Sequence, residues 1–93
     1  MSRGLGRIER AILDVIEEDE AADLECVYAA EDLAERVYRP KAWPTRAQQV
    51  ATLRAMHALA AKCPDKIALT GGKGRNPLWL YRPEDGLPDF LGD

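Results

Sequence analysis

The chain has 93 residues and a formal net charge of −3, and 46% of its residues are hydrophobic. This length accommodates one domain with its own core, and the hydrophobic fraction excludes a wholly disordered chain. No apolar run approaches the roughly 20 residues of a membrane-spanning helix, and the N-terminus lacks the apolar segment of a signal peptide. We therefore expect a cytoplasmic protein without a membrane partner.

The charges are sorted along the chain. Residues 1–35 carry 3 basic and 11 acidic side chains, whereas residues 36–82 carry 10 basic side chains and a single acid, Asp65. Residues 83–93 add four further acids. Because a local concentration of basic groups attracts phosphate whatever the total charge, the middle segment favours a polyanionic partner.

Cysteine and histidine are too few to predict a metal centre or a catalytic site. Cys26 and Cys63 form no CxxC pair, and two buried thiols are favoured over a disulfide, which stays open as the alternative. His57 is the only histidine, and no nucleophile is paired with a base. We expect neither an enzyme nor a bound metal or cofactor.

The first predicted element is a helix over about residues 5–18. Basic residues stand at its start and residues 17–20 are acidic, the reverse of what the helix dipole favours. We expect solvent to screen this cost, which makes residues 17–25 a solvated acidic end; the alternative is that the arginines bind an external anion. The apolar residues recur at spacings of three and four, which places on one face Leu5, Ile8, Ile12, Val15 and Ile16.

Shorter elements follow this helix. Residues 19–25 are polar and predict a loop, residues 26–28 a short strand, and residues 29–37 a second helix. The inward positions of this second helix are Leu33, Ala34 and Val37. The loop over residues 39–44 contains Trp43, and we expect its indole to cover the core; the alternative is a contact to a nucleic-acid sugar.

A third helix is predicted over residues 46–62, before Pro64. It begins with a capping box, in which Thr45 accepts from the Gln48 amide and the Gln48 side chain reaches back. Its apolar side holds Leu53, Met56, Leu59, Ala60 and Cys63. The opposite side holds Arg46, Ala47, Val50, Arg54, His57 and Ala61.

The last predicted element is a hairpin. Alternating patterns over residues 66–70 and 78–82 predict two strands, joined by a turn of glycines and basic residues over 71–77. In the second strand, Leu78 and Leu80 share one face, and Trp79 and Tyr81 the other.

The order helix, short strand, helix, helix, hairpin is that of a winged helix-turn-helix domain. Four segments carry the resemblance further: RGLGRI at residues 3–8, DLAERVY at 32–38, PTRAQ at 44–48 and LRAMHAL at 53–59. In this order they resemble small winged-helix regulators of actinobacteria and phages over about residues 3–82. The resemblance implies an α+β fold, with three helices and a C-terminal β-hairpin wing, in a domain of residues 1–82. Residues 83–93 are expected to be an acidic, frayed tail.

The resemblance also implies that the third helix enters the major groove of double-stranded DNA while the hairpin lies on the backbone. The residues agree with this, because no acid stands between Arg36 and Pro64. Arg46 and Gln48 are candidate base contacts, since arginine forks onto guanine and glutamine onto adenine, although Gln48 cannot fully serve as cap and base contact at once. The candidate DNA-binding residues are Arg39, Lys41, Thr45, Arg46, Gln48, Arg54, Lys73 and Arg75.

These residues predict a sequence-specific double-stranded DNA-binding protein, a transcriptional regulator or a phage or plasmid accessory factor. A homodimer, or several copies on adjacent sites, would supply the affinity that so small a module lacks. The alternative is a winged-helix adaptor whose acidic N-terminal segment binds a basic protein partner. The basic middle segment favours DNA.

Overall fold

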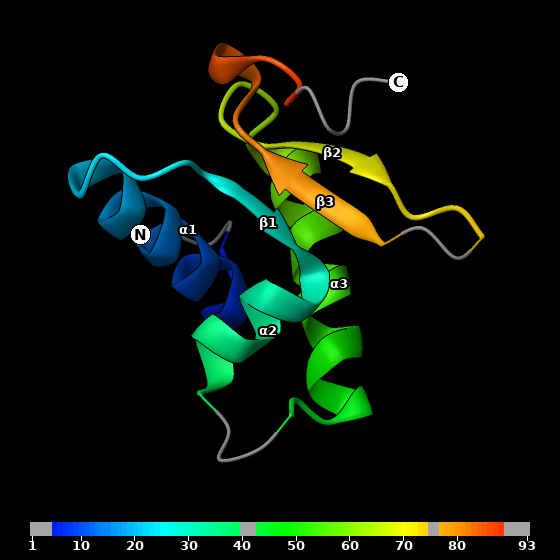
Figure 1. Cartoon of the computed structure of the whole chain (residues 1–93). Coiled ribbons are helices and arrows are strands. Elements are labelled where there is room, and N and C mark those ends of the chain that lie inside the picture. The colour runs from blue at the N-terminus through cyan, green and yellow to red at the C-terminus, as the bar shows by residue number, and fades with distance from the viewer. Residues whose placement is uncertain (1–4, 40–42, 75–76, 89–93) are drawn as a thin grey trace.

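The computed structural model describes residues 5–39, 43–74 and 77–88. Within these ranges the chain forms three helices and a three-stranded antiparallel sheet, which confirms the predicted α+β class (Figure 1). A short 3₁₀ turn follows the last strand. The elements in chain order are α1 (Arg7–Ala21), β1 (Val27–Ala29), α2 (Ala30–Tyr38), α3 (Arg46–Lys62), β2 (Ala68–Gly71), β3 (Leu78–Tyr81) and η1 (Pro83–Asp85).

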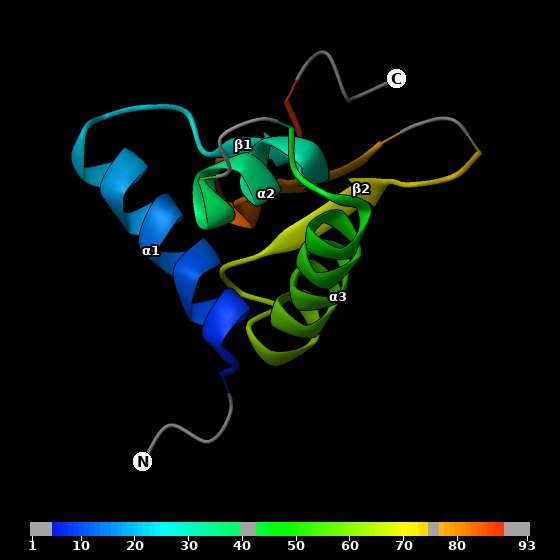
Figure 2. The same ribbon diagram turned by 90° about the horizontal axis from the view of Figure 1, so that it is seen from below.

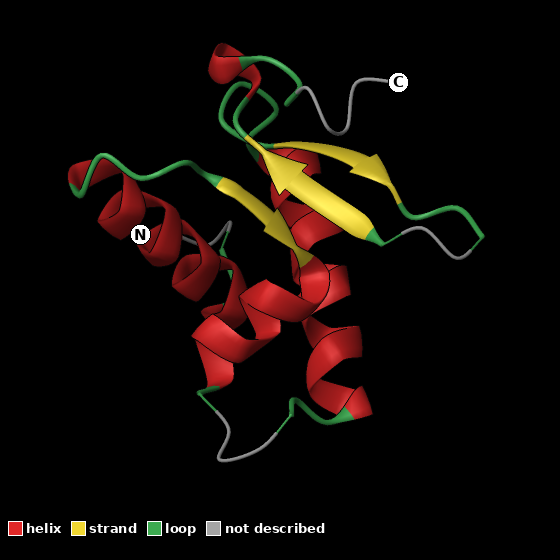
Figure 3. Ribbon diagram, viewed as in Figure 1, coloured by secondary structure: helices red, strands yellow, loops and turns green. Residues whose placement is uncertain are grey.

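The sheet has the strand order β1-β3-β2, so the last strand lies in the middle. Leu80 on β3 stands opposite Tyr28 on β1 and Leu69 on β2. In Figure 2, α1 and α3 lie on the same side of the sheet, and α2 continues directly from the end of β1. Figure 3 shows the β2–β3 hairpin extending sideways beyond the helices.

The core lies between the helices and the sheet. The predicted alternation along β3 is confirmed, because Leu78 and Leu80 are buried while Trp79 and Tyr81 are half-buried. The large side chains that are almost completely buried come from every layer of the fold and include Ile12, Leu33, Met56, Leu59, Ile67 and Leu80.

The buried side of α3 is rotated slightly from the predicted apolar side. Met56 and Leu59 are buried as expected, but Thr52 and Ala55 are buried beside them. Thr52 is tolerated there because its hydroxyl donates to the Gln48 carbonyl oxygen over 2.8 Å, which leaves no unsatisfied polar atom. The other three residues of the predicted apolar side are only partly buried: Leu53, Ala60 and Cys63.

The predicted bounds are accurate for α3 and less so for α1. The expected helix over residues 5–18 instead spans Arg7–Ala21, so the start of the predicted loop at residues 19–21 is helical. Its N-terminus is fixed at Gly6, whose backbone N–H donates to Glu9 Oε1 over 3.3 Å. The strand β1 and the helix α2 each begin one residue later than predicted, and β2 begins after Ile67.

Candidate nucleic-acid interface

The exposed side of α3 is the side that the sequence predicted. Within the described ranges, no carboxylate forms an ion pair with Arg46 or Arg54. These two guanidinium-bearing positions are eight residues apart, about 12 Å along the helix axis. The exposed residues of this side are Arg46, Ala47, Val50, Arg54, His57 and Ala61, and none of them is acidic.

The first turn of α3 is closed by a reciprocal pair of hydrogen bonds, as predicted. The Gln48 backbone N–H donates to Thr45 Oγ1 over 3.1 Å, and the Thr45 backbone N–H donates to Gln48 Oε1 over 2.9 Å. An adenine contact would use the same Gln48 amide oxygen. Since the cap already occupies that oxygen, Arg46 is the stronger of the two predicted base contacts.

The hairpin places Lys73 exposed near its tip. Gly71 and Gly72 have φ angles of +82° and +80°, a left-handed conformation that side chains disfavour. The Gly72 backbone N–H donates to the Pro77 carbonyl oxygen over 3.0 Å, and a Cβ added at Gly71 would collide with that same oxygen. In Figures 1 and 2, α1 and the hairpin tip lie at opposite sides of the molecule, with α3 between them. The predicted contact Arg75 lies outside the described residues.

The segment between α2 and α3 departs from its prediction. Arg39 is exposed and ends α2 in a left-handed conformation with φ +49°, while its backbone N–H donates to the Glu35 carbonyl oxygen over 2.9 Å. Trp43 is 75% exposed, so the expectation that it covers the core is wrong. The core between α2 and α3 is already filled by Leu33, Met56 and their neighbours, which leaves the indole outside. Lys41 lies outside the described residues.

Two basic residues of the middle segment are paired with acids and thereby leave the candidate surface. Lys62 Nζ lies 2.7 Å from Glu9 Oε1, and this hydrogen bond lowers the pKa of Glu9. Arg82 forms ion pairs with Asp85 and Glu20, and the hydrogen bond to Asp85 raises the pKa of the guanidinium. These pairs connect α1 to the end of α3 and to the end of β3.

Arg36 also forms an ion pair, and its partner Asp19 is buried. Arg36 donates from two nitrogens to the two oxygens of Asp19, over 2.9 and 3.2 Å, and Glu18 lies 3.5 Å from the same guanidinium. The Tyr28 hydroxyl donates to Asp19 over 2.7 Å. Hydrogen bonds from Arg36 and Tyr28 lower the pKa of Asp19, whereas burial, aided by the Asp19 hydrogen bond, raises the pKa of Tyr28.

This cluster shows that the acidic end of α1 is not uniformly solvated. The prediction of a solvated end is wrong at Asp19, which is only 6% exposed. The sequence contained the signal, because Asp19 follows Val15 by four residues and Ile16 by three and so continues the buried stripe of the helix. The basic partner, Arg36, cannot be identified from spacing along the chain, because it lies on a different helix.

The described residues contain no group of three or more histidine, cysteine or acidic side chains placed to hold a metal ion. Both cysteines are free thiols, as favoured from the sequence, but only Cys26 is buried as expected, whereas Cys63 is partly buried. Within the described ranges, no helix combines the length and the apolar character needed to cross a bilayer.

Comparisons with known proteins add no relative. Neither protein-family models nor curated proteins nor solved structures gave a match to this chain.

Proposed function

We propose that this chain is a winged helix-turn-helix protein that binds double-stranded DNA, with α3 in the major groove and the β2–β3 hairpin on the neighbouring backbone. The observation that carries the proposal is the selective pairing of charges. Acids engage Arg36, Lys62 and Arg82, but form no ion pair with the described cations Arg46, Arg54 and Lys73. These unpaired cations are on the two elements that a winged helix presents to DNA.

The shape of α3 supports the same role. A helix fits the major groove, and side chains at its N-terminal end approach base edges most closely. Arg46 is the first residue of α3, and the small exposed Ala47 beside it leaves room for a base edge or a thymine methyl group. We assign base contact to Arg46 and phosphate contact to Arg54 and Lys73.

The proposed DNA-binding surface ends at the helix α2. Its exposed residues Glu31, Asp32 and Glu35 are acidic and would repel a phosphate backbone. The DNA therefore lies against α3 and the hairpin, with α2 turned away. Arg39, exposed at the end of α2, and Lys41 beyond it are the contacts we propose where this edge meets the duplex.

The experiment that tests the proposal compares two alanine variants on specific and random duplexes. A preferred duplex is first selected from a random pool and then used in mobility-shift titrations. Arg46→Ala should reduce the preference for that duplex by about 1–3 kcal/mol, whereas Lys73→Ala should weaken binding to both duplexes alike. Arg10→Ala, which removes an exposed cation from α1, is the matched control and should leave both affinities unchanged.

Two outcomes would contradict this division. If Arg46→Ala lost the same affinity for specific and random duplexes, the assignment of Arg46 as a base contact would be contradicted. An effect of Arg10→Ala as large as that of Lys73→Ala would show that only the overall charge matters. A selected duplex with an inverted repeat would indicate that two copies bind together, as expected for nanomolar affinity from a small interface.

A second candidate function is supported by a groove on the acidic side. A hollow of about 460 Å³ lies between the α1–β1 connection and α2, lined in part by Leu24, Glu25, Asp32 and Glu35. Leu24 is 57% exposed, so the hollow combines an apolar contact with negative charge, which suits a basic protein segment. An adaptor of this kind would bind a lysine-rich peptide at moderate salt and would give no mobility shift with random duplex.

A further inference from the structure

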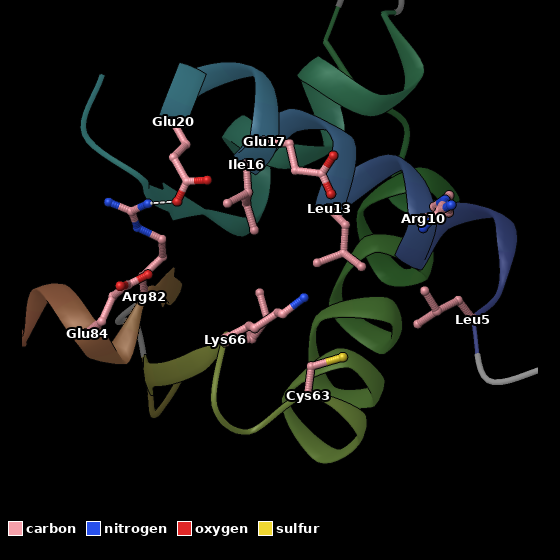
Figure 4. A pocket seen from close by; sticks show the side chains of 11 residues that line it. Leu5, Arg10, Leu13, Ile16, Glu17, Glu20, Cys63, Lys66, Arg82 and Glu84 are labelled. Atoms are coloured by element: carbon pink, nitrogen blue, oxygen red, sulfur yellow. Dashed lines mark hydrogen bonds and ion pairs between the residues drawn. The ribbon is translucent and has the colours of Figure 1, made fainter. Parts of the chain in front are cut away.

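A separate cavity lies between α1 and the segment that joins α3 to β2. Its volume is about 490 Å³, within the range of small-molecule sites. Figure 4 shows its walls, with Leu13 and Ile16 projecting from α1 and Cys63 and Lys66 approaching from the opposite wall. The cavity is distinct from the exposed side of α3 and from the hairpin tip, since it contains none of their residues.

The inner walls of this cavity are apolar. Ile16 and Ile67 belong to the buried core, and Leu5, Leu13 and Cys63 are partly buried beside it. An apolar body placed there would cover the partly exposed side chains of Leu5, Leu13 and Cys63, and burial of apolar surface is the main source of affinity for a small ligand.

Some of the charged side chains around the cavity form ion pairs, and others do not. At one end Arg82 is occupied by Glu20 and Asp85, and Glu84 lies beside it in Figure 4. Lys66 and Arg10, in contrast, form no ion pair with any carboxylate of the described chain. Figure 4 shows the Lys66 amine reaching into the cavity between Leu13 and Cys63.

We propose that this cavity binds a small amphipathic carboxylate, with its apolar body against Leu13, Ile16 and Ile67 and its anionic group at Lys66. Lys66 places a positive charge over an apolar floor, which is the arrangement that such a ligand complements. Glu17 and Glu84 also line the cavity, form no ion pair within the described residues and oppose an anion, so they limit the affinity. The proposal does not depend on DNA binding.

The test uses octanoate as the probe, with octylamine and octanol as partners of the same chain length. Each is titrated into the protein while methyl NMR resonances of Leu13, Ile16 and Ile67 are followed. Octanoate should shift these resonances at lower concentration than octanol, and octylamine should bind most weakly. Lys66→Glu should weaken octanoate about tenfold, which corresponds to one charge contact of about 1.4 kcal/mol.

Two further variants test whether octanoate affinity depends on the charge of residues that line the cavity. Lys73→Glu makes the same change of charge at the hairpin tip and should leave octanoate affinity unchanged. Glu17→Gln removes the opposing carboxylate and should tighten octanoate while weakening octylamine. Lys66 and Glu17 are exposed, so both variants should fold, which circular dichroism verifies.

The proposal would be overturned if octylamine bound as tightly as octanoate, or if Lys73→Glu and Lys66→Glu weakened octanoate equally. Shifts confined to the exposed side of α3 would overturn it as well. Because no DNA is present in this experiment, its failure leaves the mobility-shift result untouched, and the reverse also holds.

Discussion

Asp19 is the residue at which burial and charge conflict most directly. A carboxylate placed among apolar side chains is unfavourable unless its oxygens are hydrogen-bonded and its charge is compensated. Arg36 and Tyr28 meet both conditions, and they come from α2 and β1. The cluster therefore fixes how three elements are arranged around the end of α1, beyond what apolar packing alone specifies.

The two partners of this ion pair should not be equivalent in their effect on stability. Arg36→Met leaves the buried Asp19 without its cation and should reduce the free energy of unfolding by about 3 kcal/mol at pH 7. Asp19→Asn leaves the half-exposed Arg36, which keeps Glu18 at 3.5 Å, and should cost about 2 kcal/mol or less. Urea denaturation of both variants measures the difference. A larger cost for Asp19→Asn would contradict the asymmetry.

The same pair gives a dependence on pH with a definite sign. Because the folded-state pKa of Asp19 is lowered, its stabilisation is fully present above the unfolded value of about 3.9 and is lost as pH falls through the folded value. The difference in unfolding free energy between the wild-type protein and Arg36→Met should therefore shrink in strongly acidic solution. A difference that stays constant from neutral to strongly acidic pH would show that Arg36 acts by packing alone.

For single residues, the sequence predicts the face of a helix on which a residue lies better than it predicts whether the side chain is buried. The six exposed residues on the predicted side of α3 follow from helical periodicity and one cap, which are local properties. Trp43 and Asp19 were assigned the wrong environments because burial depends on which other elements lie nearby. An indole in a loop is usually covered, but here the space is occupied, and an acid at a helix end is usually solvated, but here an arginine from α2 reaches it.

Among the elements, α3 was predicted with the correct bounds because both ends carry strong local signals. Thr45 and Gln48 form the cap at the start, and Pro64 prevents continuation beyond Cys63. The helix α1 has no such signal at its C-terminal end, and its last turn is stabilised by the tertiary partners of Asp19 and Glu20 instead. The pairing of β1 with β3 is likewise a contact between distant segments, which no local pattern specified.

The hairpin is the element whose shape depends most on glycine. Gly71→Ala should reduce the free energy of unfolding by about 2–3 kcal/mol, since it adds a left-handed penalty to a collision with the Pro77 carbonyl oxygen. Gly74→Ala is the matched control: its φ is +61°, but nothing lies near an added Cβ, so only about 1 kcal/mol should be lost. Thermal and urea unfolding measure both. Equal losses would show that the collision is relieved by movement of the turn.

For the whole molecule, the sorting of charge along the sequence becomes a sorting of charge in space. The acidic end of α1 lies at one side and the hairpin tip at the other, as Figures 1 and 2 show. Ion pairs from α1 hold Arg36, Lys62 and Arg82, which are on the parts of the fold that pack against it. Among the described cations that these acids leave unpaired, Arg46, Arg54 and Lys73 lie on α3 and the hairpin and make up the candidate interface.

This separation leads to a prediction about salt. The total charge of −3 alone would give no attraction to a duplex, whereas the local surface should release counterions when it binds. The six cations proposed to contact the duplex are Arg39, Lys41, Arg46, Arg54, Lys73 and Arg75. At about −0.9 per phosphate contact, a plot of the logarithm of the affinity for random duplex against the logarithm of salt concentration should have a slope of about −5. Removing Arg54 and Lys73 together as glutamines should reduce the magnitude of that slope by about 2, because each phosphate contact contributes about 1. Arg10→Ala removes a cation of α1 outside the candidate interface and should leave the slope unchanged. A wild-type slope near zero would mean that the candidate interface does not contact phosphate.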